Sequence, residues 1–195
     1  MGTDRKWVIV RIDGKIAAIS TDYTALAAIA ARIAQQKTPA YGNICAETVD
    51  FSTVWNLRQS VKWEDLILFG TDFQLNVWRK LWELTHSGTP ADQSSQTVRL
   101  LSYSDFAESC NNKAGVRAVA HAIGLNPISV IIPCHLVIPK ETIDRIREIQ
   151  KKAESTIFKG DDLCITSLLR EKGIDFGEYA LGRKIKRELI AMEHS

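Results

Sequence analysis

Residues 102–137 read SYSDFAESCNNKAGVRAVAHAIGLNPISVIIPCHLV, and they decide how the chain is interpreted. A serine precedes a short segment of helical periodicity, which is typical of a capped helix. The turn NNKAG follows, and VRAVAHAIG predicts a second helix that ends at Gly124. Two short helices around a glycine-containing turn indicate a helix-turn-helix, although most such pairs do not bind DNA.

The same stretch ends on a cysteine that is followed by a histidine. Asn126-Pro127 interrupts the second helix, and ISVIIP predicts a short buried strand that leads into Cys134-His135. A cysteine becomes a nucleophile when a base or a positive environment favours its thiolate. Because neighbouring side chains on a strand point to opposite faces, the two residues can cooperate only if the backbone bends there. By itself, the dipeptide is better explained as a buried structural cysteine beside an incidental histidine.

The rest of the chain predicts an α+β fold. Residues 7–19 indicate a β-hairpin around Asp13-Gly14, and an alanine-rich helix follows. A helix beginning at Thr71 or Asp72 presents one apolar face, made of Phe73, Val77, Leu81 and Leu84. We expect a small N-terminal α+β domain in residues 1–65 and a mainly helical domain with the helix-turn-helix in residues 66–195.

Composition and cysteine usage narrow the class of protein. The chain has 195 residues, 45% of them hydrophobic and 25% charged, with a net charge of +2. These values are ordinary for a globular protein. A net charge this small is compatible with nucleic-acid binding but does not indicate it. Its four cysteines are scattered without zinc-ligand spacing, and neither a signal peptide nor a membrane-spanning run is visible. We therefore expect free thiols, no metal, no membrane association, and a cytoplasmic location, or a nuclear one in a eukaryote.

Three segments resemble a known family. GTDFQLNVW, at residues 70–78, resembles the pattern GTxFQxxVW of the O6-alkylguanine-DNA alkyltransferases. From residue 102 to residue 137 the chain resembles that family's SYxxLA…RAVGxAxxxNPxxxxxPCHRV, and residues 177–194 are similar to its closing GYxGGxxxKxxLLxxE. The resemblance covers about half of the chain, and the N-terminal region matches only in general character.

The resemblance implies a DNA repair protein that acts once per molecule. The alkyl group of O6-alkylguanine in double-stranded DNA would move irreversibly to Cys134, with no cofactor and with the protein as a monomer. His135 would act as base through a bound water, Glu193 would orient and stabilise that histidine, and Asn126 would brace the turn that holds the site.

The resemblance also implies how the lesion is reached. Because O6 lies inside the stacked duplex, the base must rotate out, and Tyr103 would promote this rotation while Arg117 fills the vacated space. Ala118 and other small residues of that helix would permit minor-groove binding without sequence readout. Val137, Tyr179 and Ala180 would line the substrate pocket. Phosphate contacts would come from Lys113, Arg183, Lys184, Lys186 and Arg187.

The chain departs from the family pattern at four places. Leu136 stands where the family has an arginine, His121 where it has glycine or alanine, and Ala180-Leu181 where it has serine or glycine. The fourth departure is an insertion at about residues 140–176, which carries a charged amphipathic helix predicted at residues 140–157. The insertion fits a lid, a partner surface or an additional DNA contact equally well.

Two other functions compete with alkyl transfer. An alkyltransferase-like damage sensor would bind the lesion with little or no transfer, and Leu136 and His121 are the features that favour it. A cysteine hydrolase would require an oxyanion hole and a deacylating water, and no segment of the sequence indicates either.

Overall fold

The computed structural model describes residues 5–21, 23–35, 42–86, 100–154, 165, 169 and 173–194. An antiparallel three-stranded sheet near the N-terminus is followed by a mainly helical stretch, which confirms the predicted α+β class. Within those residues, no helix is long and apolar enough to cross a membrane. The elements are β1 (Trp7–Ile12), β2 (Lys15–Ser20), α1 (Thr24–Gln35), β3 (Ile44–Val49), α2 (Phe51–Ser60), η1 (Trp63–Asp65), α3 (Asp72–His86), β4 (Leu101–Ser102), α4 (Tyr103–Ser109), η2 (Lys113–Gly115), α5 (Val116–Gly124), η3 (Cys134–Leu136), β5 (Val137–Ile138), α6 (Lys140–Glu154) and α8 (Arg183–Glu193).

The chain divides into two compact units, each built from two separate segments. The first unit comprises Met1–Trp82 and Leu125–Cys134, and the second comprises Glu83–Gly124 and His135–Ser195. The domain boundary near residue 65 stays a prediction.

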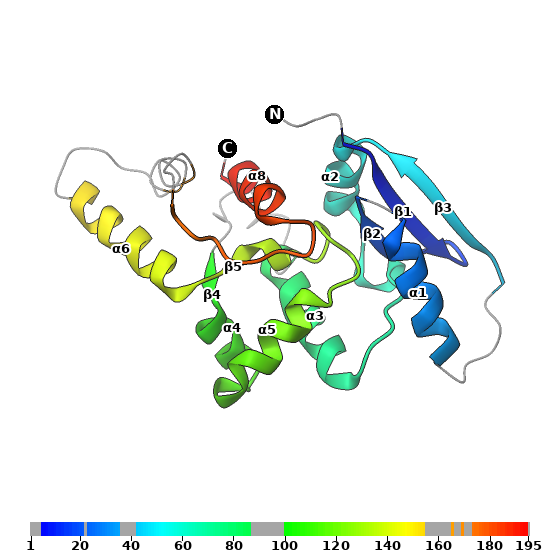
Figure 1. Cartoon of the computed structure of the whole chain (residues 1–195), viewed down its shortest axis with the longest axis horizontal. Helices are drawn as coiled ribbons and strands as arrows, with labels where there is room; N and C mark the ends of the chain where they lie inside the picture. Colours follow the sequence, from blue (N-terminus) through cyan, green and yellow to red (C-terminus); the bar gives the residue numbers. More distant parts are fainter. Residues whose placement is uncertain are drawn as a thin grey trace. The chain divides into compact units, whose positions relative to one another are not determined.

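The first unit contains an antiparallel sheet in the order β2-β1-β3 (Figure 1). Asp13 and Gly14 connect β1 to β2, and both have positive φ, 50° and 82°. Such a pair is what a two-residue hairpin turn requires, because it matches the twist of the strands. The predicted hairpin is therefore confirmed.

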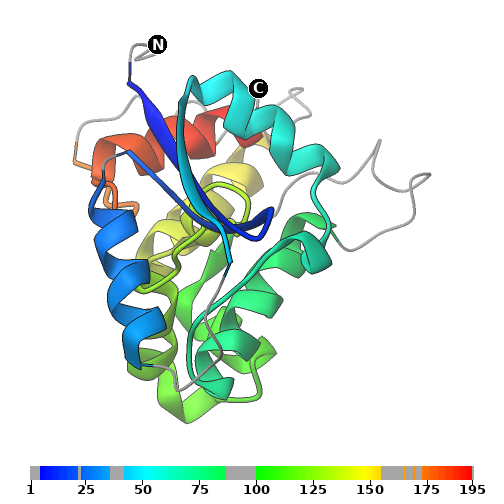
Figure 2. The ribbon, with the colours of Figure 1, turned by 90° about the vertical axis from the view of Figure 1, so that its right-hand side faces the viewer.

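Helices pack on this sheet through apolar side chains. Ile29 of α1 joins the cluster that contains Val8 and Val10 of β1. Trp7, whose side chain alternates to the opposite face, meets Phe51 of α2 with 5.5 Å between ring centroids. Figure 2 shows α2, in cyan, beside this end of β1.

The helix predicted after residue 70 begins as expected. The backbone N–H of Gln74 donates to Thr71 Oγ1 at 3.3 Å, and the Thr71 N–H donates to Gln74 Oε1 at 2.9 Å. This reciprocal pair satisfies two N–H groups at the start of α3. Val77 and Leu81 of its predicted apolar face are fully buried.

The two predicted helices of residues 102–124 are present as α4 and α5. Ser102 Oγ accepts the backbone N–H of Asp105 at 3.0 Å, which is the expected cap of α4. The buried residues of α5 are Val119, Ala122 and Ile123. Use of the pair as a DNA-reading helix-turn-helix stays a prediction.

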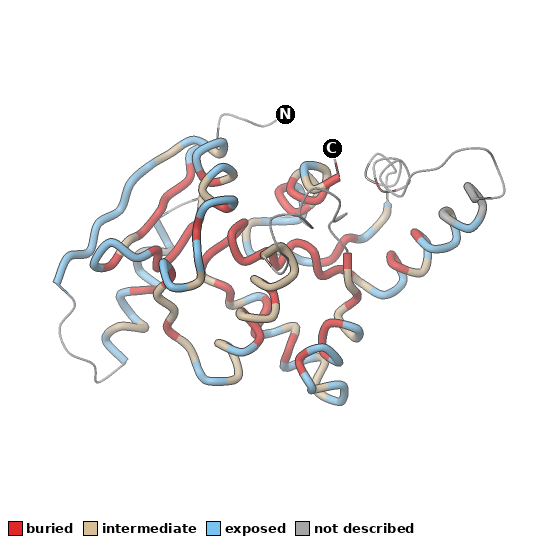
Figure 3. The backbone as a smooth tube through the Cα atoms, turned by 180° about the vertical axis from the view of Figure 1, so that it is seen from behind, coloured by how far each residue is buried: buried red, intermediate tan, exposed pale blue. Residues whose placement is uncertain are grey.

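The core of the second unit surrounds the short parallel pair of β4 and β5, in which Leu101 is paired with Val137. Helix α6 confirms the predicted amphipathic helix as far as Glu154, since Ile143 and Ile146 are buried while Arg145 and Glu148 are exposed; residues 155–157 of the prediction lie outside the described residues. Figure 3 shows buried and exposed stretches alternating along the backbone of this helix. The core cluster consists of Leu100, Leu136, Ile138, Ile143, Ile146, Ile165, Phe176 and Ile190.

The strand predicted for residues 128–133 is wrong. Ile128 forms only an isolated bridge to Ile19, and the segment then turns, with the Ile132 N–H donating to the Ile128 carbonyl at 3.0 Å. Val130 has a φ of 74°, which breaks an extended conformation. The apolar run predicted burial correctly, but after Pro127 and Ser129 exchange backbone hydrogen bonds with Ile19 of β2, the N–H groups of Ile131 and Ile132 donate within the turn.

Candidate active site

The turn before Cys134 is held by one buried amide side chain. Asn126 is 8% exposed, and its Oδ1 accepts the N–H of Ile128 at 3.0 Å. Its Nδ2 donates to the carbonyl of Ile132 at 2.8 Å and to Cys134 Sγ at 3.1 Å. Cys134 itself is 5% exposed. An N–H donor aimed at sulfur stabilises negative charge there, so Asn126 both shapes the turn and favours the reactive form of the thiol.

The next residue belongs to a buried acid–base pair in the second unit. His135 Nε2 lies 2.8 Å from Glu193 Oε1, and the two side chains are 0% and 3% exposed. An ionised carboxylate can only accept, so Nε2 carries the hydrogen of this bond and Nδ1 is the basic ring nitrogen. The predicted pairing of His135 with Glu193, 58 residues apart in sequence, is thus present in the structure.

Cys134 and His135 follow each other in the single 3₁₀ turn η3, which spans Cys134–Leu136. A 3₁₀ turn has about three residues per turn, so successive side chains are separated by about 120° instead of pointing to opposite faces. The backbone therefore bends at the point where cooperation between the two residues requires it.

A second group of residues gathers at the loop between Gly177 and Gly182. Gly177 has a φ of 83°, and a Cβ placed there would lie 3.3 Å from both Tyr103 Oη and Lys186 Nζ. Lys186 Nζ donates to the Val137 carbonyl at 2.7 Å and lies 5.7 Å from the centroid of the Tyr103 ring. The loop, the first residue of α4 and a buried ammonium thus meet at one place.

The predicted contact between Lys186 and a DNA phosphate is wrong. The Lys186 side chain is 1% exposed, so it cannot contact DNA phosphates as expected. Arg187 is also engaged inside the unit, because it donates to the carbonyls of Leu169 and Ile174 at 3.0 and 3.3 Å. The helical spacing offered a signal: Lys186 lies one residue after Ile185 and three before Leu189, both of which are buried on the inner side of α8.

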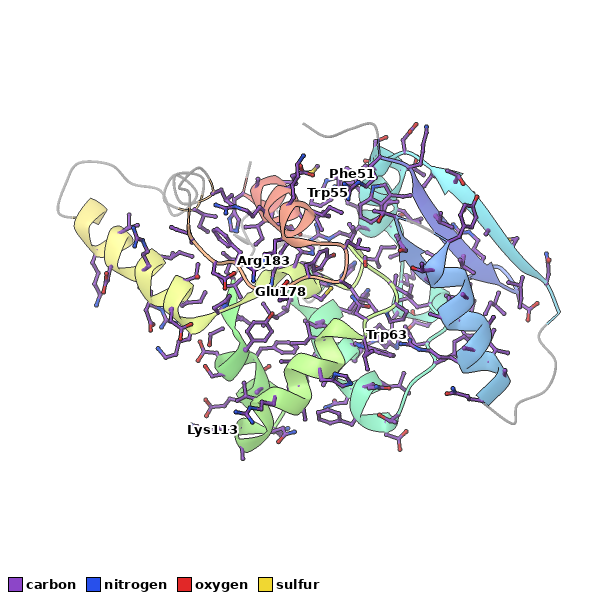
Figure 4. The ribbon with its side chains drawn as sticks, in the orientation of Figure 1. Phe51, Trp55, Trp63, Lys113, Glu178 and Arg183 are labelled. Carbon is purple, nitrogen blue, oxygen red and sulfur yellow. The ribbon has the colours of Figure 1, made fainter. Side chains whose placement is uncertain are left out.

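Glu178 of this loop forms a surface ion pair with Arg183, the first residue of α8. Arg183 Nε donates to Glu178 Oε1 at 2.9 Å (Figure 4). This hydrogen bond holds the pKa of the Glu178 carboxyl below its ordinary value and raises the pKa of Arg183. Of the residues predicted to line the pocket, Tyr179 is half-buried and Ala180 is exposed in this loop, while Val137 is buried in β5.

The outer face of α5 carries the residues predicted to contact DNA. Arg117, Ala118 and His121 are exposed, one helical turn or less apart, opposite the buried face of the helix. Lys113, just before α5, is also exposed and pairs with Glu108 at 3.0 Å (Figure 4). In the described part of the chain, no cluster of three or more acidic, histidine or cysteine side chains could hold a metal ion.

A buried cysteine is followed in the sequence by a histidine that pairs with a glutamate, and the chain also presents an exposed helix face. These features indicate a candidate thiol site and a candidate nucleic-acid surface. Residues 95–154 match the family described as 6-O-methylguanine DNA methyltransferase, DNA binding domain. Residues 95–154 thus match the DNA-binding domain of the O6-alkylguanine-DNA alkyltransferase family, which confirms the resemblance found in the motifs for this part of the chain.

Two relatives support this assignment, and one solved structure shares the fold. A probable methylated-DNA–protein-cysteine methyltransferase of Acanthamoeba polyphaga mimivirus is 42% identical over 76 residues, which are 39% of this chain and 44% of the relative. The inducible methylated-DNA–protein-cysteine methyltransferase of Bacillus subtilis is 45% identical over 71 residues, which are 36% of this chain and 34% of the relative. The chain thus spans less than half the length of these relatives. The O6-methylguanine-DNA methyltransferase of Pyrococcus kodakaraensis shares the fold, with a TM-score of 0.56, 16% identity and coverage of 99% of this chain and 95% of that one.

Replacing Asn126 by alanine is expected to lower the free energy of unfolding by about 2 kcal/mol, because buried turn groups lose their partners. Chemical denaturation of the two proteins measures the difference. Asn43 is exposed just before β3, and its replacement by alanine is the matched control. Equal effects of the two substitutions would show that the Asn126 hydrogen bonds do not hold the turn.

Proposed function

We propose that the chain repairs DNA by transferring the alkyl group from O6 of an alkylated guanine irreversibly to Sγ of its own Cys134. One observation carries the proposal: the buried thiol that accepts a hydrogen bond from Asn126 is followed directly by His135, whose Nε2 is engaged by the buried Glu193. These features support an activated nucleophile, in which His135 would serve the thiol as a base and Glu193 would orient that base.

The transfer is a single displacement. Nδ1 of His135 takes the thiol proton, directly or through a water, and the resulting imidazolium is stabilised by Glu193. The thiolate attacks the alkyl carbon, an S–C bond forms, and the C–O6 bond breaks with its electron pair remaining on the guanine oxygen. The product is a thioether, which water does not readily cleave, so each molecule reacts once.

The leaving guanine needs a proton as the C–O6 bond breaks. Tyr103 supplies it in this proposal, because its hydroxyl lies at the Gly177 position of the loop that would receive the base. The ammonium of Lys186, 5.7 Å from the Tyr103 ring centroid, stabilises the negative charge that develops on the phenol. Tyr179, Ala180 and Val137 complete the pocket.

Binding to DNA rests on the DNA-binding domain that residues 95–154 match. A base must leave the duplex before a buried thiol can reach its O6 atom. The exposed Arg117 of α5 would fill the vacated stack, and the small Ala118 beside it would allow the helix to enter the minor groove. Lys113 would contact a phosphate.

Intact-mass measurement tests the proposed function. The protein is incubated with a duplex oligonucleotide that carries one O6-methylguanine, and we expect a gain of one methyl group per molecule, mapped by peptide analysis to Cys134. Cys134→Ala should abolish this gain. Cys110→Ala is the matched control, because Cys110 is also buried, at 6% exposure, and lies outside the site.

Other results would favour the competing functions. Tight binding of the lesion by a protein whose Cys134 stays unmodified would indicate a damage sensor. Repeated turnover of an ester that depends on Cys134 would indicate a hydrolase. Either outcome would overturn the proposal.

A further inference from the structure

The two ends of the insertion are joined by a buried hydrogen bond. Thr142, in the first turn of α6, is 5% exposed, and its Oγ1 donates to the carbonyl of Asp175 at 2.5 Å. The described parts of the insertion also share one apolar core, in which Ile143 and Ile146 of α6 pack with Phe176. A segment built into the core of its unit is a structural support rather than a lid.

Asp175 connects the insertion to the loop at residues 177–182. Its Oδ1 accepts the backbone N–H of Gly177 at 2.8 Å. The position of Gly177 is constrained, because a Cβ there would lie 3.2 Å from Pro139 Cδ and 3.3 Å from Tyr103 Oη. Any shift of this residue therefore changes how the loop approaches Tyr103.

The ion pair between Asp175 and Arg183 contributes less to the position of the loop than the hydrogen bond to Gly177 does. Arg183 Nη1 lies 3.8 Å from Asp175 Oδ1, and both side chains are more than half exposed. Exposed pairs at this distance are screened by water and stabilise little. The backbone hydrogen bond to Gly177, and not the charge of the carboxylate, is what fixes the start of the loop.

We propose that the insertion braces the loop that holds the extruded guanine, with Thr142 and Asp175 as positioning residues. Thr142 fixes the backbone of Asp175, Asp175 fixes Gly177, and the loop is thereby held in a conformation ready for the base before DNA arrives. The inference rests on the proposed function, since it assigns the loop to the guanine. It goes further by giving the insertion a role in recognising the lesion.

Single-turnover kinetics test the brace. The rate of methyl transfer is measured against the concentration of the O6-methylguanine duplex, and binding of the undamaged duplex is measured separately. Asp175→Ala and Thr142→Val should each raise the half-saturating concentration of lesion duplex about threefold to tenfold, the effect of one lost hydrogen bond. The affinity for undamaged duplex should stay the same, because only an extruded base meets the loop.

Conservative variants and a control distinguish a positioning role of Thr142 and Asp175 from a general loss of protein stability. Asp175→Asn keeps an oxygen for Gly177 and Thr142→Ser keeps the hydroxyl, so both should behave like the unaltered protein. Asp144→Ala removes an exposed α6 carboxylate that pairs with Lys140 at 2.6 Å, away from the loop, and should also have no effect.

Three outcomes would overturn the inference: an unchanged half-saturating concentration in Asp175→Ala and Thr142→Val, an equal loss of affinity for undamaged duplex, or an effect of Asp144→Ala as large as theirs. Failure of the proposed function is distinguishable, because the unaltered protein would then transfer no methyl group at all.

Discussion

Replacing His135 by glutamine is expected to slow methyl transfer by about two to four orders of magnitude, the usual contribution of a positioned general base. The glutamine amide can still donate to Glu193, but it has no basic nitrogen to take the thiol proton. The measurement is the single-turnover rate constant with saturating lesion duplex, so weakened binding does not enter the comparison.

His86→Gln is the control for this substitution. His86 ends α3, and its Nδ1 lies 2.9 Å from Thr85 Oγ1. A rate for His135→Gln within about threefold of the unaltered protein, with the fold intact, would rule out His135 as the base. The thiol would then have to be activated by the Asn126 amide alone.

The sequence predicted several local elements correctly. Helix α3 was predicted from its apolar face and from a cap at Thr71 or Asp72, and in the structure Thr71 forms the cap together with Gln74. The hairpin was predicted because Asp13-Gly14 is a strong turn signal. Both depend on interactions between residues a few positions apart, which a single sequence displays directly.

Other features depend on partners far apart in the chain. The pairing of His135 with Glu193 came from the resemblance, because nothing within the sequence itself connects the two residues. The segment at 128–133 was predicted as a strand because it is a short apolar run, yet the chain turns there and Asn126 bonds to Ile128 and Ile132 from within the turn. Lys186 was misassigned because its acceptor, the carbonyl of Val137, is 49 residues away.

Leu136→Arg is expected to lower the free energy of unfolding by about 3–5 kcal/mol, because it buries a charge without a partner. Leu136 is 0% exposed and packs in the cluster that includes Ile143 and Ile146 of the insertion. Denaturant unfolding measures the loss, which is a large fraction of the total stability of an ordinary domain.

Two control variants show whether the lower free energy of unfolding of Leu136→Arg comes from burying the charge. Leu136→Met keeps the volume and should cost less than about 1.5 kcal/mol. Ile44→Arg places the same charge on β3 at a residue that is 47% exposed, and should change stability by less than about 0.5 kcal/mol. Full stability of Leu136→Arg would mean that the apolar cluster does not enclose this position. A large loss restricted to Leu136→Arg would instead show that the leucine and the insertion depend on each other: the isoleucines of α6 cover the position after His135, and an arginine there is compatible only with a chain that leaves it open to water.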